Sequence, residues 1–368
     1  MSDLDRIDDA IRALGQGRMV IVVDDDDREN EGDLILAAER ATPEQIAFMI
    51  RHTSGILCTP LTSDHAKRLR LDPMVNANDA PLGTAFTVSV DYRHGLTTGI
   101  SAEERTATVR ALANNNCGAE DFVRPGHVFP LLARDGGVLI RSGHTEAAVD
   151  LARLAGAAPV GVIGELVNDD GSVKRLGDCR AFAAEHDLAI VSIADLIDYR
   201  QRREHLVERV THFDVQTAHG PATAYVYRTP FDPLQQVALV FGDVVNGSPV
   251  LARIHREQVV ADLFAAETAG GAARRALARI AKEGRGVLVY LRDGLAVPPR
   301  EPEPPDSLPD EGHGSAQARR DRWREVGVGA QILRDLGVHS IRLLTTSQRQ
   351  YVGLGGFGIE IAANEPLD

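Results

Sequence analysis

The segment of residues 20–35 constrains the fold most, because it places eight charged groups within ten residues between two apolar runs. The run before Asp24 and the run at 34–38 predict two buried strands. The loop between them begins and ends in the core, so its carboxylates cannot all separate into solvent. Crowded acids in such a loop are stabilised by a cation or a bound basic group. The alternative is an ordinary acidic surface turn, but Arg28 beside Glu29 and the turn at Gly32 and Asp33 favour a binding loop.

Length and composition limit the classes of protein that this chain can be. A chain of 368 residues is long for one core, which predicts two domains. Its 43% hydrophobic and 25% charged residues are typical of a globular protein. The formal net charge of -13 argues against a nucleic-acid partner, since phosphates require a basic face. The start has no signal-peptide pattern and no run has the length of a membrane span, so we expect a cytoplasmic protein without a membrane partner.

Local signals mark the beginnings of several elements. Residues 4–14 predict a short amphipathic helix before the first strand. Thr42, Pro43 and Gln45 form a capping-box pattern that begins a helix running through residue 49. The Thr-Thr-Gly-Ile turn of residues 97–100 leads into a second capping box, Ser101 to Glu104, and a helix over 102–113. Free backbone N–H groups at such a turn suit a phosphate or a carboxylate.

Two histidines occur in similar frames and are predicted on adjacent strands. His127 follows a Pro-Gly turn in residues 124–130, and His144 follows Arg141, Ser142 and Gly143, just before a helix ending near residue 154. A single histidine in such a place is more often structural, but two in the same frame favour function. Thr145 is the expected N-cap, and with Arg141 it would face an anion at the helix N-terminus.

Three further residues allow a functional or a structural interpretation. Glu165 stands in an apolar run, where partial desolvation should raise the pKa of its carboxyl toward a value useful for acid-base catalysis. The alternative is an outward-facing residue on an edge strand. For His52 and Cys58, in the turn of residues 51–58, the structural interpretation is favoured. Cys58, Cys117 and Cys179 are widely spaced without a CxxC, which argues against a disulfide framework or a zinc knuckle.

Five motifs in order, at 27–33, 51–58, 96–101, 124–130 and 141–145, resemble 3,4-dihydroxy-2-butanone 4-phosphate synthase over roughly residues 3–200. The family converts ribulose 5-phosphate to a four-carbon phosphate and formate. The resemblance implies a homodimer with Mg²⁺ or Mn²⁺, two ions per active site, bound by Glu29 and His144. It also implies proton transfer by His127 and Glu165. The implied substrate-binding residues are Arg28, Glu29, Asp33, Arg141, Ser142, Gly143, His144, Thr145 and Glu165.

The rest of the chain resembles GTP cyclohydrolase II, with strands expected at 213–226 and 237–244 and with family landmarks at 250–255, 283–291, 327–338 and 341–345. The expected fold class is therefore α/β, with two mixed α+β domains, at 1–204 and 205–368. The positions of the family's three zinc-binding cysteines hold Gln258, Ala269 and Gly271, and its catalytic Asp-x-Arg pair falls on Arg322 and Arg324. Thr346, Ser347, Gln348 and Gln350 replace further family residues, and the proline-rich and acidic tract at 297–309 predicts a disordered loop.

These replacements imply a second domain without zinc and without cyclohydrolase activity. One alternative is a bifunctional enzyme that retains both activities. Another is a binding or scaffolding module whose synthase half is also inactive. This last interpretation is disfavoured, because every site residue implied for the first domain is present.

Overall fold

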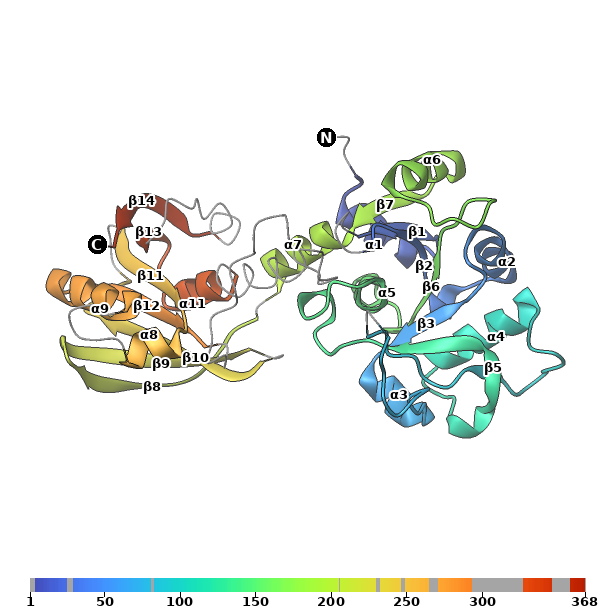
Figure 1. The fold of residues 1–368 in the computed structure, drawn as a ribbon, viewed down its shortest axis with the longest axis horizontal. Coiled ribbons are helices and arrows are strands. Elements are labelled where there is room, and N and C mark those ends of the chain that lie inside the picture. Colours follow the sequence, from blue (N-terminus) through green and yellow to red (C-terminus); the bar gives the residue numbers. More distant parts are fainter. Residues whose placement is uncertain are drawn as a thin grey trace. The chain divides into compact units, whose positions relative to one another are not determined.

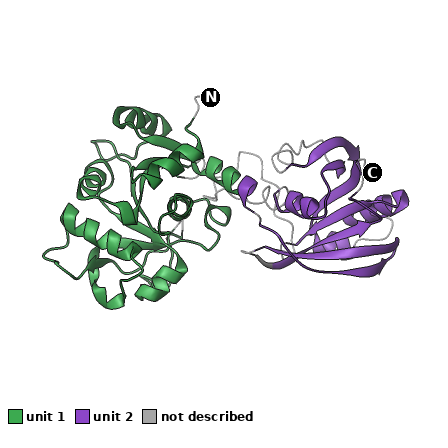
Figure 2. Ribbon diagram, turned by 180° about the vertical axis from the view of Figure 1, so that it is seen from behind, with its two compact units in different colours: residues 1–200 green, residues 201–368 purple. Residues whose placement is uncertain are grey.

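A computed structural model describes residues 4–24, 29–80, 83–204, 206–229, 232–245, 249–264, 271–292, 327–345 and 358–367. The chain divides into two compact units, residues 1–200 and 201–368, which Figure 2 shows in different colours. Each unit is built on a seven-stranded sheet with helices against it (Figure 1). The predicted α/β class with two mixed domains is therefore confirmed. None of the helices in the described ranges combines the length and the apolarity that crossing a bilayer requires.

The first unit has the strand order β4-β5-β3-β6-β2-β1-β7, with parallel pairing of β1 with β7 and of β3 with β5. Its strands are β1 (Val20–Val23), β2 (Gly32–Ala37), β3 (Cys58–Leu61), β4 (Val90–Tyr92), β5 (Phe122–Leu132), β6 (Gly161–Glu165) and β7 (Ala189–Ser192). Its helices are α1 (Ile7–Gly15), α2 (Pro43–His52), α3 (Ser63–Leu69), α4 (Ala102–Ala113), α5 (His144–Leu154), α6 (Leu176–His186) and α7 (Ile193–Arg203). Short 3₁₀ turns are η1 (Ala38–Arg40), η2 (Ala119–Asp121) and η3 (Gly137–Leu139).

Strand alternation directs the side chains of this sheet to two layers of helices. Ile21, Val23, Leu34 and Leu36 join one core cluster with residues of α2, α4 and α6. The intervening residues of β1 and β2 face the other way, and α5 packs against β1, β2, β3 and β6. The apolar runs that predicted these strands are buried along their whole length, as expected for strands covered on both faces.

The capping box predicted for α2 is confirmed in full, and the one predicted for α4 is confirmed in part. Thr42 and Gln45 form the reciprocal capping box of α2, with a proline in its first turn. Ser101 caps α4, accepting from the backbone N–H of Glu104 at 3.1 Å. The Glu104 carboxylate, however, accepts from the backbone N–H of Thr97 at 2.6 Å. The acid of α4 therefore occupies donors of the turn that we expected to hold an external anion.

Both predictions about the histidine frames need correction. His127 does not follow a turn, because residues 122–132 form one strand, β5, and its pairing with β4 shifts between Val90 and Asp91. Residues 124–127 bulge out there, and the bulge includes the cis Arg124-Pro125 bond. His144 is the first residue of α5 and lies on no strand, so the two histidines are not on adjacent strands. Gly143 is the N-cap in place of Thr145, because the extended backbone before the helix ends at Gly143.

The second unit has the strand order β14-β13-β11-β12-β10-β9-β8. Its strands are β8 (Glu208–Thr217), β9 (Gly220–Thr229), β10 (Asp232–Phe241), β11 (Val250–Arg256), β12 (Gly286–Leu291), β13 (Ser340–Thr345) and β14 (Glu360–Pro366). Its helices are α8 (Val259–Phe264), α9 (Ala272–Glu283) and α11 (Gly329–Asp335), with α9 packed on β11 and β12. The single strand predicted at 213–226 is two antiparallel strands, since a turn at Thr217 and Gly220 divides it. The tract at 297–309 lies outside the described residues.

Candidate functional site

The acidic loop of the first unit is held at both ends by the pairing of β1 with β2, in which Val23 lies opposite Gly32. Asp24, the first acid of the loop, organises the described part of it. Its carboxylate accepts from the backbone N–H groups of Glu29, at 3.1 Å, and Glu31, at 2.9 Å. The chain must turn sharply between them, and Asn30 adopts a left-handed backbone with φ 53. Arg28 lies outside the described residues.

His144 brings α5 to this loop. Its imidazole is buried, and Nε2 lies 3.1 Å from the carbonyl oxygen of Val22, which can only accept a hydrogen bond. Nε2 therefore carries the proton, and Nδ1 lies 3.3 Å from Glu29 Oε2 and 3.9 Å from Asp33 Oδ1. Potential ligand atoms of Asp24, Glu29 and His144 all lie within 4.8 Å of one another. In the neutral ring, the Nδ1 lone pair faces carboxylates, which is the donor arrangement of a metal site.

Asp33 and Glu165 extend this group, because β2 and β6 pair with these two residues opposite each other. The Asp33 side chain is buried, and its Oδ1 has no hydrogen-bond partner within the described part of the chain. Burial raises the pKa of Asp33 to about 7, which nearby His144 opposes and the charge of Glu165 reinforces. Glu165 is half-buried and accepts a hydrogen bond from the Ser54 hydroxyl at 2.8 Å. β6 lies between β3 and β2, so the edge-strand alternative for Glu165 is wrong.

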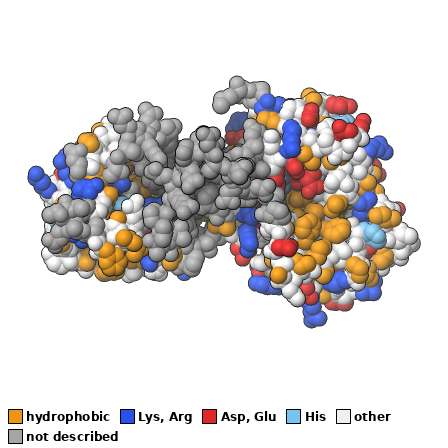
Figure 3. Space-filling model, in the orientation of Figure 1, with side chains coloured by type: hydrophobic (Ala, Val, Ile, Leu, Met, Phe, Trp, Pro, Cys, Tyr) orange, Lys and Arg blue, Asp and Glu red, His pale blue; other side chains and the backbone are white. Residues whose placement is uncertain are grey.

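The electrostatics of these residues fit a cation. Burial works to lower the pKa of His144, but the charges of Asp33, Glu29 and Asp24 outweigh it and raise this pKa to about 9. The pKa of Glu31 is also raised, by burial and by Glu29. In the space-filling view, a small group of acidic side chains lies together on the visible face of the first unit, and other acidic and basic side chains are spread over that face (Figure 3). A divalent ion would relieve this excess of negative charge, and it suits a mixed carboxylate and imidazole donor set.

The frame before α5 is held by an internal ion pair. Arg141 Nη1 lies 2.8 Å from the buried carboxylate of Glu146, and the guanidinium crosses Gly143 so closely that a Cβ there would lie 2.4 Å from Nη1. Ser142 is half-buried and Thr145 is buried. Glu146 is a residue that the sequence reasoning missed. Its position five residues after Arg141, on the first turn of a helix, was the available signal.

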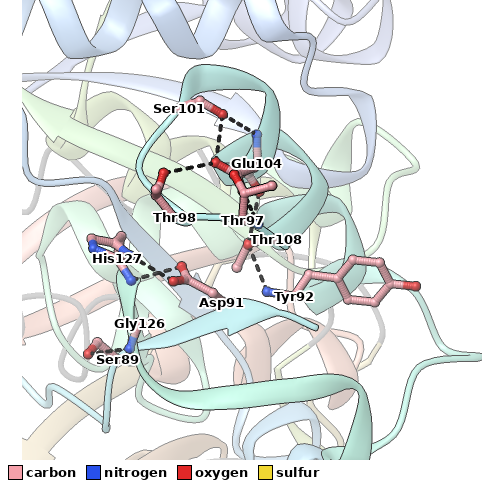
Figure 4. A network of polar contacts seen from close by, with 10 residues as sticks. All are labelled: Ser89, Asp91, Tyr92, Thr97, Thr98, Ser101, Glu104, Thr108, Gly126 and His127. Atoms are coloured by element: carbon pink, nitrogen blue, oxygen red, sulfur yellow. Dashed lines mark hydrogen bonds and ion pairs between the residues drawn. The ribbon is translucent and has the colours of Figure 1, made fainter. Parts of the chain in front are cut away.

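His127 lies in a second cluster, in the bulge of β5. Its Nδ1 lies 2.7 Å from Oδ2 of Asp91 on β4, a residue that the sequence analysis did not select (Figure 4). Asp24 was also not selected, although it ends an apolar run directly. Cys58 is buried, and burial raises the pKa of its thiol well above the usual range, with Glu165 and Asp33 adding to the effect. His52 packs in an aromatic cluster with Phe182 and His186, which agrees with a structural role.

Two sequence families match this chain. Residues 8–199 match 3,4-dihydroxy-2-butanone 4-phosphate synthase, and residues 208–366 match GTP cyclohydrolase II. The chain belongs to the 3,4-dihydroxy-2-butanone 4-phosphate synthase family. A Nocardia farcinica protein named riboflavin biosynthesis protein RibBA is 48% identical, across 100% of this chain and 91% of the relative. An Arabidopsis thaliana relative, named as bifunctional and chloroplastic, is 47% identical across 98% of this chain and 68% of its own length. The chain is thus an enzyme of riboflavin biosynthesis.

Solved structures resemble the whole chain or its synthase unit. RibBX from A. baumannii, described as a two-domain synthase, is 39% identical with a TM-score of 0.79, covering 98% of this chain and 99% of that one. A synthase solved in complex with two magnesium ions is 47% identical with a TM-score of 0.53, covering 54% of this chain and 98% of that one. The recognition of both families from sequence motifs is confirmed.

Proposed function

We propose that the synthase reaction takes place where Glu29, Asp33, His144 and Glu165 meet, with D-ribulose 5-phosphate as the substrate and L-3,4-dihydroxy-2-butanone 4-phosphate and formate as the products. One observation carries this proposal. The buried Oδ1 of Asp33 has no hydrogen-bond partner among the described residues, and it lies beside an imidazole whose Nδ1 faces carboxylates. A buried, unpaired polar atom of this kind points to a ligand.

Glu29 and His144, with Asp24 beside them, would hold Mg²⁺ or Mn²⁺, two ions per site in the proposed form. The bound ions would supply Lewis-acid stabilisation of charge on the vicinal oxygens of the substrate. Asp33 would bind a substrate hydroxyl, because a buried carboxyl with a raised pKa can donate or accept a proton there. Arg28 and the frame of residues 141–145 would bind the rest of the substrate, including its phosphate at the N-terminus of α5.

Proton transfer is assigned to two residues of this chain. Glu165, held by the Ser54 hydroxyl, would take a proton from a carbon next to the ketone, and His127 would move protons at adjacent positions. A homodimer and a cytoplasmic location remain predictions, and they rest on the family resemblance and on the composition. The absence of a nucleic-acid partner is also a prediction, and it rests on the formal net charge of -13.

For the second unit we propose loss of cyclohydrolase activity. The His255 imidazole hydrogen-bonds to both carboxylate oxygens of Asp262, at 3.1 and 2.9 Å, and Asp262 also accepts from the backbone N–H of Gln258. The Asp262 carboxylate therefore lies beside two of the expected zinc positions, Gln258 and Gly271, and already accepts hydrogen bonds there. Ala269, Arg322, Arg324, Thr346, Ser347, Gln348 and Gln350 lie outside the described residues. The competing proposal, a bifunctional enzyme, is favoured by the name of the Arabidopsis relative.

The test uses the full-length protein after treatment with EDTA. Formate release from ribulose 5-phosphate should be lost on chelation and restored by Mg²⁺ or Mn²⁺. Full activity in excess EDTA, or no activity with ribulose 5-phosphate after either ion is returned, would contradict the proposed site.

A further inference from the structure

We propose that Asp91 is a positioning residue for the synthase reaction, which holds His127 in the one tautomer that can accept a proton at Nε2. This inference rests on the proposed function, in which His127 moves protons. Asp91 lies on β4, and His127 lies in the bulge of β5 opposite it. The two residues are 36 positions apart in the sequence, so only the fold brings them together.

Both oxygens of the Asp91 carboxylate bind His127. Oδ1 accepts from the backbone N–H of His127 at 2.8 Å, and Oδ2 lies 2.7 Å from its Nδ1. An ionised carboxylate can only accept, so Nδ1 carries the ring proton. In the neutral ring, Nε2 is then left with its lone pair. The His127 side chain is 42% exposed, whereas that of Asp91 is 4% exposed, so the histidine is open to a substrate and its partner is not.

A buried arginine lies near Asp91. Arg105 of α4 is buried and close enough for its positive charge to interact with Asp91. Its Nε has no hydrogen-bond partner in the described ranges, and the hydrogen bond from Nη1 to the Gly55 carbonyl is long, at 3.4 Å. A buried cation with so few partners favours an ionised carboxylate nearby. Gly55 follows Ser54 in the sequence, and the Ser54 hydroxyl donates a hydrogen bond to Glu165. One short segment thus contacts both Arg105 and Glu165.

Two glycines enclose the pair so closely that a side chain has no room. Gly99 has φ +82, and a Cβ there would lie 2.2 Å from Asp91 Oδ2 and 2.8 Å from His127 Nδ1. Gly126 lies against the backbone of β4, where its Cβ would be 2.0 Å from the carbonyl carbon of Val90. Gly126 also donates its backbone N–H to the Ser89 hydroxyl at 3.1 Å. Glycine at these two positions therefore lets the backbone approach the Asp91 carboxylate and the β4 strand that carries it.

The residues on either side of Gly99 are held by α4, and Figure 4 shows these contacts of Thr97, Thr98 and Ser101 with Glu104. The Glu104 carboxylate accepts from the backbone N–H of Thr97 at 2.6 Å and from the Ser101 hydroxyl at 3.0 Å. The Thr108 hydroxyl of the same helix accepts from the backbone N–H of Tyr92, the residue after Asp91, at 2.9 Å. One helix thus holds both the turn above the pair and the strand that carries Asp91.

A second Asp–His pair in the same unit provides a matched control. His94 Nε2 lies 2.7 Å from Asp121 Oδ1, the same distance as in the first pair, but the His94 side chain is 58% exposed and the Asp121 side chain 24%. No residue proposed for the reaction belongs to this pair. A change that acts only by removing a carboxylate from a histidine should have the same effect on both pairs.

The experiment compares D91N, H127S, the double variant D91N/H127S and the control D121N in the full-length protein with Mg²⁺. Formate release from ribulose 5-phosphate gives kcat and KM, and thermal unfolding monitors the fold. Asparagine keeps the shape but presents an N–H₂ group, which favours the opposite tautomer. We expect D91N to lower kcat by roughly a hundredfold or more with little change in KM, as for loss of an acid-base group. D121N should retain its kcat, and D91N should cost nothing further in the H127S background.

The tautomer gives a second readout, which a merely structural role would not change. With ¹⁵N-labelled histidine, the His127 signals are those missing from the spectrum of H127S. In the otherwise unchanged protein, Nδ1 should carry the proton at neutral pH, and in D91N the proton should move to Nε2. If D91N fails to fold, the tautomer of the unchanged protein decides the question, and protonation at Nε2 overturns the inference.

The possible failures can be told apart. Full kcat in D91N together with a severe loss in H127S would refute the role of Asp91 and leave that of His127 intact. Full kcat in H127S would instead refute the proton-transfer role of His127 itself. An additive loss in D91N/H127S would show that Asp91 does not act through His127.

Discussion

Glu29 supplies a carboxylate oxygen that lies 3.3 Å from Nδ1 of His144. We predict that Glu29→Gln leaves the fold intact and abolishes most of the synthase activity, because the amide has the same shape but no charge to hold the ion. Loss of a residue that only supports a metal ligand costs roughly 10–100-fold, so loss of a ligand should cost more than about a hundredfold in kcat. The measurement is formate release from ribulose 5-phosphate over a range of Mg²⁺ concentrations.

The control for this change is Glu103→Gln, which neutralises an exposed acid in the first turn of α4. It should have normal activity and the same thermal unfolding temperature. A folded Glu29→Gln protein with a normal rate at low Mg²⁺ would remove Glu29 from the metal site.

Asp33 predicts a pH dependence in the metal-free protein. Its pKa is raised by burial to about 7 in the folded protein, from an ordinary value of 3.8. Between these values the folded state holds a proton that the unfolded chain has released. The free energy of unfolding should therefore fall as the pH rises from about 4 to about 7. Asp33→Asn cannot titrate and should reduce this dependence, as measured by urea unfolding in EDTA at several pH values.

The exposed residue Asp79 provides the control, since Asp79→Asn should leave the pH dependence unchanged. An equal slope in Asp33→Asn and in the unchanged protein would mean that Asp33 does not hold this proton.

At the residue scale, sequence reasoning selected those groups that stand in one loop or one short frame. Glu29 and Asp33 belong to one heptapeptide, and His144 stands in a compact frame, so each has a local signal. Asp91 has none, because its partner His127 is 36 residues away and the pairing depends on a strand bulge. A bulge of this kind depends on how two strands meet, and that is set by tertiary packing.

At the element scale, the beginnings of α2 and α4 could be predicted because capping is a local interaction. The Glu104 carboxylate does more than cap, since its pKa is lowered to about 2 by the hydrogen bonds from the backbone N–H and the hydroxyl of Thr97. A lowered carboxyl pKa stabilises the folded state above the unfolded value of 4.5. That contribution is lost as the pH falls through the folded pKa.

We therefore predict that Glu104→Gln lowers the free energy of unfolding at neutral pH. The difference from the unchanged protein should shrink as the pH falls from about 4.5 toward about 2, because the Glu104 carboxyl takes up its proton first in the unfolded chain and then in the folded protein. Denaturant unfolding at several pH values measures it, with Glu103→Gln as the control. A difference that stays constant over this range would show that the Glu104 charge does not hold the turn.

At the scale of the whole molecule, sequence reasoning identified two domains and their families, because apolar runs and motif order survive over long stretches. It could not predict which side chains contact one another at the positions where the zinc ligands are replaced. There, Asp262 joins β11, α8 and β12, accepting hydrogen bonds from His255, the Gln258 backbone and the Tyr290 hydroxyl. These hydrogen bonds depend on Asp262, which lies outside the family motif, so the motif could not predict them.

The last prediction follows from this arrangement and concerns the purified full-length protein. It should contain no stoichiometric zinc, release no formate from GTP, and release formate from ribulose 5-phosphate. Ring opening of GTP needs a metal-activated water, and Gln258 and Gly271 offer no thiolate to hold zinc. Among the residues that the structure describes, the one group of three potential ligands is that of Asp24, Glu29 and His144. Elemental analysis and the two formate assays, with and without added Zn²⁺, are the measurements. Formate from GTP above a no-enzyme control would instead establish a bifunctional enzyme, in which ligands other than cysteine activate the water.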